Sequence, residues 1–263
     1  MRILFLWGMF LACALAVQAE TDSLRILFIG NSYTYYHDLP EKVQKLALQT
    51  NPDNGIKIAY EAYTPGGCTL KRHLQNKEEL KAIRKGTWDY VVLQEQSSAP
   101  AKPTETVARE TYPYARQLDS LVHAYNPQAK VIYYMTWGHK DGCLHKMEHY
   151  PIVNTYEGMQ DRLMISYFEM AYQNNGWCAP VGMAWKQMRK ERPFHTLYWP
   201  DGTHPSVLGT YLAANVIWAT IFQKPYQSTF LDGLDAELAE YVQQLAQKTV
   251  YRNRMLLNLD AVR

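Results

Sequence analysis

Short apolar runs of strand-forming residues alternate along the chain with longer stretches in which apolar residues recur every three or four positions. The first run, residues 24–29, ends at Gly30. Such runs predict buried strands, and the longer period predicts amphipathic helices. Strands are predicted at residues 24–29, 56–62, 88–93, 129–135 and 177–179. Helices are predicted at residues 38–50, 73–84, 105–125, 153–174, 184–191 and 207–222, with one or two more within 235–259.

This alternation of strands and helices indicates one parallel sheet covered on both faces, because parallel strands need crossover connections and helices supply them. The expected fold class is α/β: a three-layer α/β/α sandwich with a flavodoxin-like parallel sheet. No internal repeat, low-complexity segment or linker interrupts the pattern, and 47% of the 263 residues are hydrophobic. We therefore expect residues 20–263 to form a single domain.

Residues 1–19 have the pattern of a signal peptide. A basic start is followed by an apolar stretch at residues 3–15 and a small-residue cleavage site at residues 17–19. The chain is therefore expected to be exported to the periplasm or the cell exterior. Cys13 raises a lipoprotein anchor as an alternative, but the residues before it match a lipid-attachment motif poorly. No later run is long enough to span a bilayer, so we expect no stable membrane insertion.

Charge and cysteine content limit which functions and which disulfides are expected. The chain has 27 basic and 25 acidic residues, a balance that gives no case for nucleic-acid binding. Loss of the leader would leave Cys68, Cys143 and Cys178, which allow at most one disulfide, for instance between Cys143 and Cys178. The 20 tyrosines and 7 tryptophans can pack in the core, and aromatic rings can also stack on sugar rings.

Two short segments near opposite ends of the chain carry candidate chemistry. Ser32 directly follows Gly30-Asn31 at the end of the first predicted strand, and ligands bind at that edge of open α/β sheets. By itself, Gly-Asn-Ser favours an ordinary turn over a nucleophile site, because turns readily select these residue types. Asp201 and His204 change the balance, because serine, histidine and a carboxylate are the parts of an acyl-transfer triad.

These segments resemble the SGNH, or GDSL, hydrolase superfamily. Its Gly-Asp-Ser block corresponds to residues 30–32, with asparagine in place of aspartate, and its Asp-x-x-His block corresponds to residues 201–204. The glycine expected after the second strand is Gly67. After the third strand the family normally has an asparagine, whereas residues 94–96 here are Gln-Glu-Gln. This resembles the carbohydrate-esterase branches in which a glutamine takes that place.

The resemblance implies the strand order 2-1-3-4-5 and a mechanism that needs no cofactor. Ser32 would be the nucleophile, His204 the general base and Asp201 the carboxylate that orients the imidazole. The oxyanion hole implied by the family has three donors: the backbone amides of Ser32 and Gly67 and the side-chain amide of Gln94, with Gln96 as the rival for the third.

The substrate expected from export, aromatic content and this resemblance is an O-acyl, above all an O-acetyl, ester on a carbohydrate, either small or polymeric. The alternatives are a lipase or short-chain acyl esterase of the same fold, and a glycan-binding protein without catalysis. A metal-dependent hydrolase would have to use the polar side chains of residues 139–149. Their spacing is irregular and lysines interrupt it, so we expect no metal there and place this segment at the rim of the substrate cleft.

Overall fold

Five parallel strands form the sheet in the order β2-β1-β3-β4-β5. The computed structural model describes residues 23–50 and 56–260, so the predicted signal peptide and Cys13 lie outside the described residues. The strands are β1 Leu24–Ile29, β2 Ile58–Tyr63, β3 Tyr90–Leu93, β4 Lys130–Tyr134 and β5 Trp177–Ala179. The predicted order is confirmed, and β1 and β5 match their predicted bounds residue for residue.

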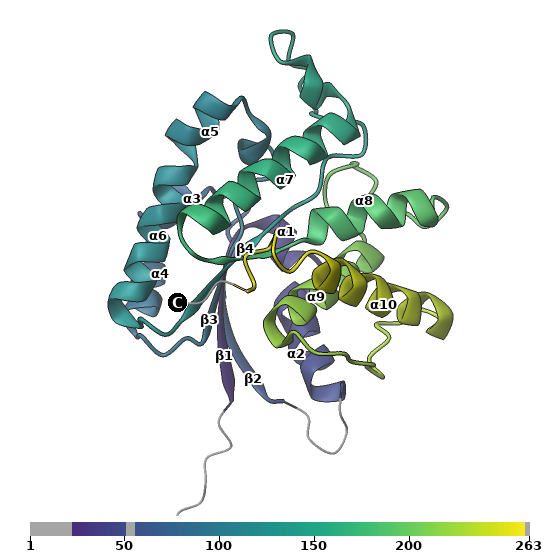
Figure 1. Ribbon diagram of the computed structural model, residues 1–263, viewed down its shortest axis with the longest axis horizontal. Helices are drawn as coiled ribbons and strands as arrows, with labels where there is room; N and C mark the ends of the chain where they lie inside the picture. The colour runs from purple at the N-terminus through teal and green to yellow at the C-terminus, as the bar shows by residue number, and fades with distance from the viewer. Residues whose placement is uncertain (1–22, 51–55, 261–263) are drawn as a thin grey trace, which may run out of the picture.

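Helices cover both faces of this sheet (Figure 1). The α-helices are α1 Ser32–Tyr35, α2 Leu39–Gln49, α3 Leu70–His73, α4 Lys77–Arg84, α5 Thr104–Glu110, α6 Tyr112–Tyr125, α7 Tyr156–Gln173, α8 Val181–Glu191, α9 Val207–Phe222 and α10 Ala236–Arg252. Short 3-10 helices are η1 Tyr36–Asp38, η2 Ala99–Ala101 and η3 Pro151–Asn154. One layer contains α2, α8, α9 and α10, and the other contains α4, α6 and α7. The predicted α/β/α sandwich is therefore confirmed.

Two of the predicted helices are interrupted. The helix expected at residues 105–125 breaks at Thr111, where Pro113 in the first turn of α6 has no amide hydrogen to continue α5. The helix expected at residues 73–84 is also two helices, because Asn76 starts α4 afresh by accepting hydrogen bonds from backbone amides in its first turn. Among the described residues, no helix is both long and apolar enough to cross a bilayer.

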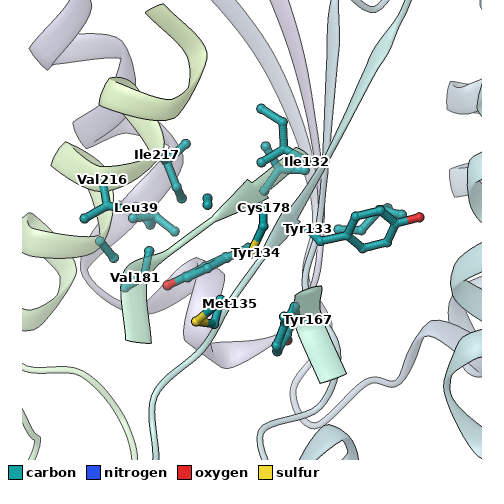
Figure 2. Close-up of a cluster of buried hydrophobic side chains, with 14 of the residues drawn as sticks. Leu39, Ile132, Tyr133, Tyr134, Met135, Tyr167, Cys178, Val181, Val216 and Ile217 are labelled. Carbon is teal, nitrogen blue, oxygen red and sulfur yellow. The ribbon is translucent and has the colours of Figure 1, made fainter. Parts of the chain in front are cut away.

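The central strands are buried on both faces, which explains their continuous apolar runs. Figure 2 shows Tyr133 and Tyr134 of β4 projecting to opposite sides of the strand, with Tyr134 on the side of Leu39 and Ile217. All four side chains are fully buried. Helix α9 is buried almost all round between the sheet and its neighbouring helices, as expected for a helix without a polar face.

The three cysteines in the described part of the chain do not pair. Cys68, Cys143 and Cys178 are free and buried, so within the described part of the chain the disulfide considered between Cys143 and Cys178 is wrong. Cys178 lies inside β5, whereas Cys143 lies in the loop after β4 and packs its sulfur 3.9 Å from that of Met159. Burial raises the pKa of the Cys178 thiol, which makes it an inert core residue.

Candidate active site

Ser32 stands at the carboxyl end of β1, as the first residue of α1. The chain must pass very close to the neighbouring strand end here. A Cβ atom on Gly30 would lie 2.5 Å from Thr34 Oγ1 and 2.7 Å from Gln94 Oε1, so only glycine fits. Ser32 is 8% exposed, and it lines a cavity at the carboxyl end of the sheet.

Asn31 joins this turn to the loop after β2. Its Oδ1 accepts a hydrogen bond from the Tyr33 amide at 3.1 Å and caps α1. Its Nδ2 donates to the carbonyl of Cys68 at 3.0 Å, which ties the serine turn to the glycine loop. Asparagine can do both because it carries a donor and an acceptor, whereas an ionised aspartate can only accept.

The structure brings Ser32, His204 and Asp201 together in one chain of contacts. His204 Nε2 lies 2.9 Å from Ser32 Oγ, and His204 Nδ1 lies 2.5 Å from Asp201 Oδ2. The other carboxylate oxygen, Asp201 Oδ1, accepts from the backbone amides of Thr203 at 2.8 Å and His204 at 3.0 Å. The carboxylate therefore fixes both the loop and the imidazole ring.

These contacts keep Asp201 ionised. Burial would raise the pKa of its carboxyl group, but hydrogen bonds from the Thr203 amide, the His204 ring and the His204 amide together lower that pKa to about 2. Asp201 is consequently a fixed negative charge next to the His204 ring at any ordinary pH.

Stacked aromatic rings support the loop that carries His204. Trp137 donates its indole N–H to the carbonyl of Thr203 at 3.0 Å. Its ring is stacked between Tyr33, with ring centroids 4.5 Å apart, and Trp185, with centroids 3.9 Å apart. Because these rings are buried, the loop rests on a rigid base.

Tyr36 covers the His204 ring itself. The two rings are stacked, with centroids 4.4 Å apart and planes at 16°. The next two residues, His37 and Asp38, both have left-handed backbone, with φ of 51° and 56°, which is uncommon for residues other than glycine. The His37 ring donates through Nε2 to the carbonyl of Pro205 at 3.2 Å. The turn that holds Tyr36 is thus fastened to the segment that holds His204.

A cavity of about 500 Å³ opens in front of Ser32 and His204. Its walls come from the turn after β1, the loop after β3 and the loop after β4. The lining residues are Asn31, Ser32, Tyr33, Gly67, Gln96, Ser97, Ser98, Ala101, Lys102, His139, Cys143, Leu144, His145, Met147, Thr203 and His204. A volume of this size suits a small organic ligand.

The backbone amides of Ser32 and Gly67, two residues that line this cavity, have no partner within the described residues. Gly67 has left-handed backbone with φ of 62°, and no atom lies within 4 Å of where its Cβ would be. Glycine therefore suits this left-handed turn, and the space beside its Cα is open.

Gln94 is not placed as expected. Its side chain is fully buried and does not line the cavity. Its Oε1 accepts from the Asn31 amide and the Thr34 hydroxyl, both at 2.9 Å, and its Nε2 donates to the carbonyl of Glu95 at 2.5 Å. The expectation that Gln94 is the third oxyanion donor is wrong, because this side chain is buried away from the cavity and its oxygen holds the serine turn in place instead.

The rival, Gln96, does line the cavity. Its Oε1 accepts from the backbone amides of Ser98 at 2.9 Å and Ala99 at 3.0 Å, which fixes the side chain. Its Nε2 lies 3.1 Å from the hydroxyl of Ser97. The amide group of Gln96 carries two donor hydrogens, so one is left over for a ligand.

Sequence reasoning missed a buried polar layer beneath the serine turn. The ring of His73 donates through Nε2 to the carbonyl of Gly30 at 2.9 Å, and its Nδ1 lies 2.7 Å from Glu79 Oε2. Glu95 is also buried, and burial raises its pKa to about 7 although it accepts hydrogen bonds from the amides of Gln96 and Leu70. The only sequence signal for this layer was the run of polar residues after β3.

The segment of residues 139–149 forms one wall of the cavity. His139 is 5% exposed and its Nε2 lies 3.2 Å from the hydroxyl of Ser97. Burial lowers the pKa of His139 to about 4, so its ring is neutral at ordinary pH. No cluster of three or more histidine, cysteine or acidic side chains suited to a metal ion occurs in the described part of the chain.

Comparison with known proteins gives structural neighbours only. No family model and no curated protein matches the sequence. A protein from Slackia heliotrinireducens assigned to the SGNH hydrolases is 25% identical, with a TM-score of 0.59 over 76% of this chain and 100% of that one. A DUF4886 family protein from Bacteroides uniformis is 19% identical, with a TM-score of 0.65 over 88% and 95%. An acetylxylan esterase mutant from Geobacillus stearothermophilus is 18% identical, with a TM-score of 0.52 over 75% and 94%.

Proposed function

This chain belongs to the SGNH/GDSL hydrolase superfamily, and on that basis we propose that it is a serine esterase that hydrolyses carboxylic esters. The proposal is carried by one observation: the hydroxyl of Ser32 lies 2.9 Å from His204 Nε2, while the other ring nitrogen, Nδ1, is hydrogen-bonded to the carboxylate of Asp201. Asp201 holds the proton on Nδ1, which leaves Nε2 free to accept the proton of the serine.

The proposed reaction has two halves. Ser32 Oγ attacks the ester carbonyl carbon as its proton moves to His204 Nε2, and the ionised Asp201 stabilises the imidazolium that forms. His204 then gives this proton to the departing alcohol, which leaves an acyl group on Ser32. In the second half His204 takes a proton from water, and the resulting attack releases the acid.

The oxyanion of the tetrahedral intermediate needs donors aimed at the cavity. We assign this role to the backbone amides of Ser32 and Gly67, which have no other partner within the described residues. Gln96 is the side-chain candidate for a third donor, because it lines the cavity and Gln94 does not. Losing one such donor typically slows turnover about a hundredfold or more.

The proposed substrate is an O-acyl, above all an O-acetyl, ester of a carbohydrate. The cavity of about 500 Å³ has room for a short acyl group or one sugar ring. Two of the structurally similar proteins are described as acetylxylan esterases. The neutral charge balance of the chain also suits an uncharged substrate.

The test is hydrolysis of 4-nitrophenyl acetate by the wild type, by Ser32→Ala and by a control, Ser120→Ala, whose side chain is exposed on α6. We expect Ser32→Ala to lose activity by about a thousandfold or more, with the control unchanged. Equal activity of Ser32→Ala and wild type would remove Ser32 from the mechanism. A wild type that cleaves no ester but binds acetylated oligosaccharides would instead indicate a glycan-binding protein, and a preference for long-chain esters would indicate a lipase.

A further inference from the structure

A row of aromatic rings lies next to the cavity and is not part of its lining. Tyr35 contacts Tyr36, with ring centroids 5.3 Å apart, and Tyr36 contacts His37 at 5.8 Å. His37 in turn contacts Trp199 at 5.9 Å. Tyr36 is also the ring that stacks on His204, so this row runs past the general base of the proposed reaction.

The rings at the two ends of the row, Tyr35 and Trp199, are partly exposed to solvent, and each lies next to a residue of the proposed active site. Tyr35 is 45% exposed, and its hydroxyl lies 3.9 Å from where a Cβ on Gly66 would be, beside the proposed oxyanion donor Gly67. Trp199 is 47% exposed, and its backbone amide donates to the carbonyl of His204 at 2.8 Å. Large half-exposed rings gathered at one place are typical of a binding surface.

The backbone that presents these rings is held in a disfavoured conformation. His37 and Asp38 are both left-handed, and two tertiary hydrogen bonds fasten the turn: His37 Nε2 to the carbonyl of Pro205, and the Thr210 hydroxyl to the carbonyl of Tyr36 at 3.3 Å. Residues kept in such a conformation by their surroundings are characteristic of functional sites.

We propose that this aromatic row is a subsite for a neutral oligosaccharide, on the alcohol side of the scissile ester. The inference rests on the proposed esterase function and extends it. Flat rings with one open face suit the C–H face of a sugar ring. An acyl chain gains more by entering the cavity, whose wall contains Leu144 and Met147.

The test compares two substrates in the wild type, Tyr35→Ala, Trp199→Ala and a matched control. The control is Tyr125→Ala, because Tyr125 is 47% exposed but ends α6, at the sheet edge opposite the site. The substrates are 4-nitrophenyl acetate and a panel of partially O-acetylated xylo- and manno-oligosaccharides. The measured quantity is the ratio of kcat/KM for the best oligosaccharide to kcat/KM for 4-nitrophenyl acetate.

Each row variant is expected to lower this ratio about two- to tenfold, mainly through KM for the oligosaccharide, since one aromatic stacking contact is lost. Tyr125→Ala is expected to leave the ratio unchanged. The subsite is refuted if the ratio is unaffected in both row variants, if no member of the panel is cleaved while 4-nitrophenyl acetate is, or if the variants lose activity on long-chain nitrophenyl esters instead. Failure of the esterase proposal itself looks different, because Ser32→Ala would then cleave 4-nitrophenyl acetate as well as the wild type does.

Discussion

Tyr36 lies flat against the imidazole of His204, and this contact becomes more favourable when the ring gains a positive charge. In the proposed reaction that charge appears as Ser32 gives up its proton. A ring that stabilises the imidazolium therefore acts on the transition state more than on substrate binding.

We predict that Tyr36→Leu lowers kcat for 4-nitrophenyl acetate about three- to tenfold with little change in KM, because a cation–π contact of about 1 kcal/mol is lost. Tyr36→Phe keeps the aromatic face and should retain most of the activity. Steady-state kinetics of both variants check this. An equal loss in the phenylalanine variant would show that the hydroxyl, rather than the stacked ring, is what matters.

Glu95, a residue of the buried polar layer, makes the stability of the fold depend on pH. Burial raises its pKa from the ordinary value of 4.5 to about 7, so the folded state holds this proton more tightly than the unfolded state does. The free energy of unfolding contributed by Glu95 is therefore largest below pH 4.5 and falls as the pH rises to about 7.

We predict that Glu95→Gln gains stability relative to the wild type between pH 5 and pH 8, by up to about 3 kcal/mol, since glutamine has no proton to lose. Urea unfolding at both pH values measures this difference. His139 has the opposite sign in the wild type, because its pKa is lowered to about 4 and its contribution is lost as the pH falls from 6.5. The His139 contribution is the same in both chains, so it cancels when the free energy of unfolding of the wild type is subtracted from that of Glu95→Gln. A difference between the two chains that stays constant with pH would contradict the prediction.

At the scale of elements, α9 is held tightly at its first turn. A Cβ on Gly209 would lie 2.3 Å from the carbonyl oxygen of Leu197 and 2.6 Å from the ring of Trp185. Neither neighbour is free to move, because one is backbone and the other is buried in the aromatic stack under the His204 loop.

We therefore predict that Gly209→Ala destabilises the fold by about 2 kcal/mol or more, although alanine normally favours a helix. Gly66→Ala is the control, since a Cβ there meets only the hydroxyl of Tyr35 at 3.9 Å. Thermal unfolding of the two variants checks this. If Gly209→Ala is as stable as the control, α9 can move to accommodate the extra methyl group without a loss of stability, and the prediction is wrong.

Element positions were more predictable than element continuity. The bounds of α9 were predicted residue for residue, because a predominantly apolar stretch runs from Val207 to Phe222. The break at Thr111 was not predicted, since the apolar period continues across it and the interruption comes from Pro113, two residues further on. Periodicity reports which face is buried, and it does not report where a backbone hydrogen bond is missing.

At the scale of the whole molecule, we propose that the chain is exported, on the basis of the residue pattern at 1–19. The prediction is that expression in a bacterium with a secretory pathway yields a mature protein that starts near Glu20 and is found outside the cytoplasm. N-terminal sequencing of the fractionated protein measures this. Retention of residues 1–19 in the cytoplasmic fraction would refute export, and a lipid on Cys13 would favour the anchored alternative.

Site residues could be predicted only where a sequence motif specifies both the residue type and its position in the fold. Ser32, Asp201 and His204 could be named because their spacing and strand-end position matched a known chemistry. Gln94 was misplaced because sequence gives the end of β3 but not the direction of each side chain after it. The support from Trp137 and Tyr36 could not be found at all, since an aromatic residue at the site has the same sequence pattern as one in the core.

Ser32 and His204 lie 172 residues apart in the chain yet touch in the folded protein. The segment with His204 is followed directly by α9, which packs on α2 and β5 and is itself covered by α10. A chain emerging from the ribosome would thus carry its nucleophile from the start but lack the helices that bring the base to it. Hydrolytic activity should therefore begin only after α9 and α10 have been synthesised and have docked.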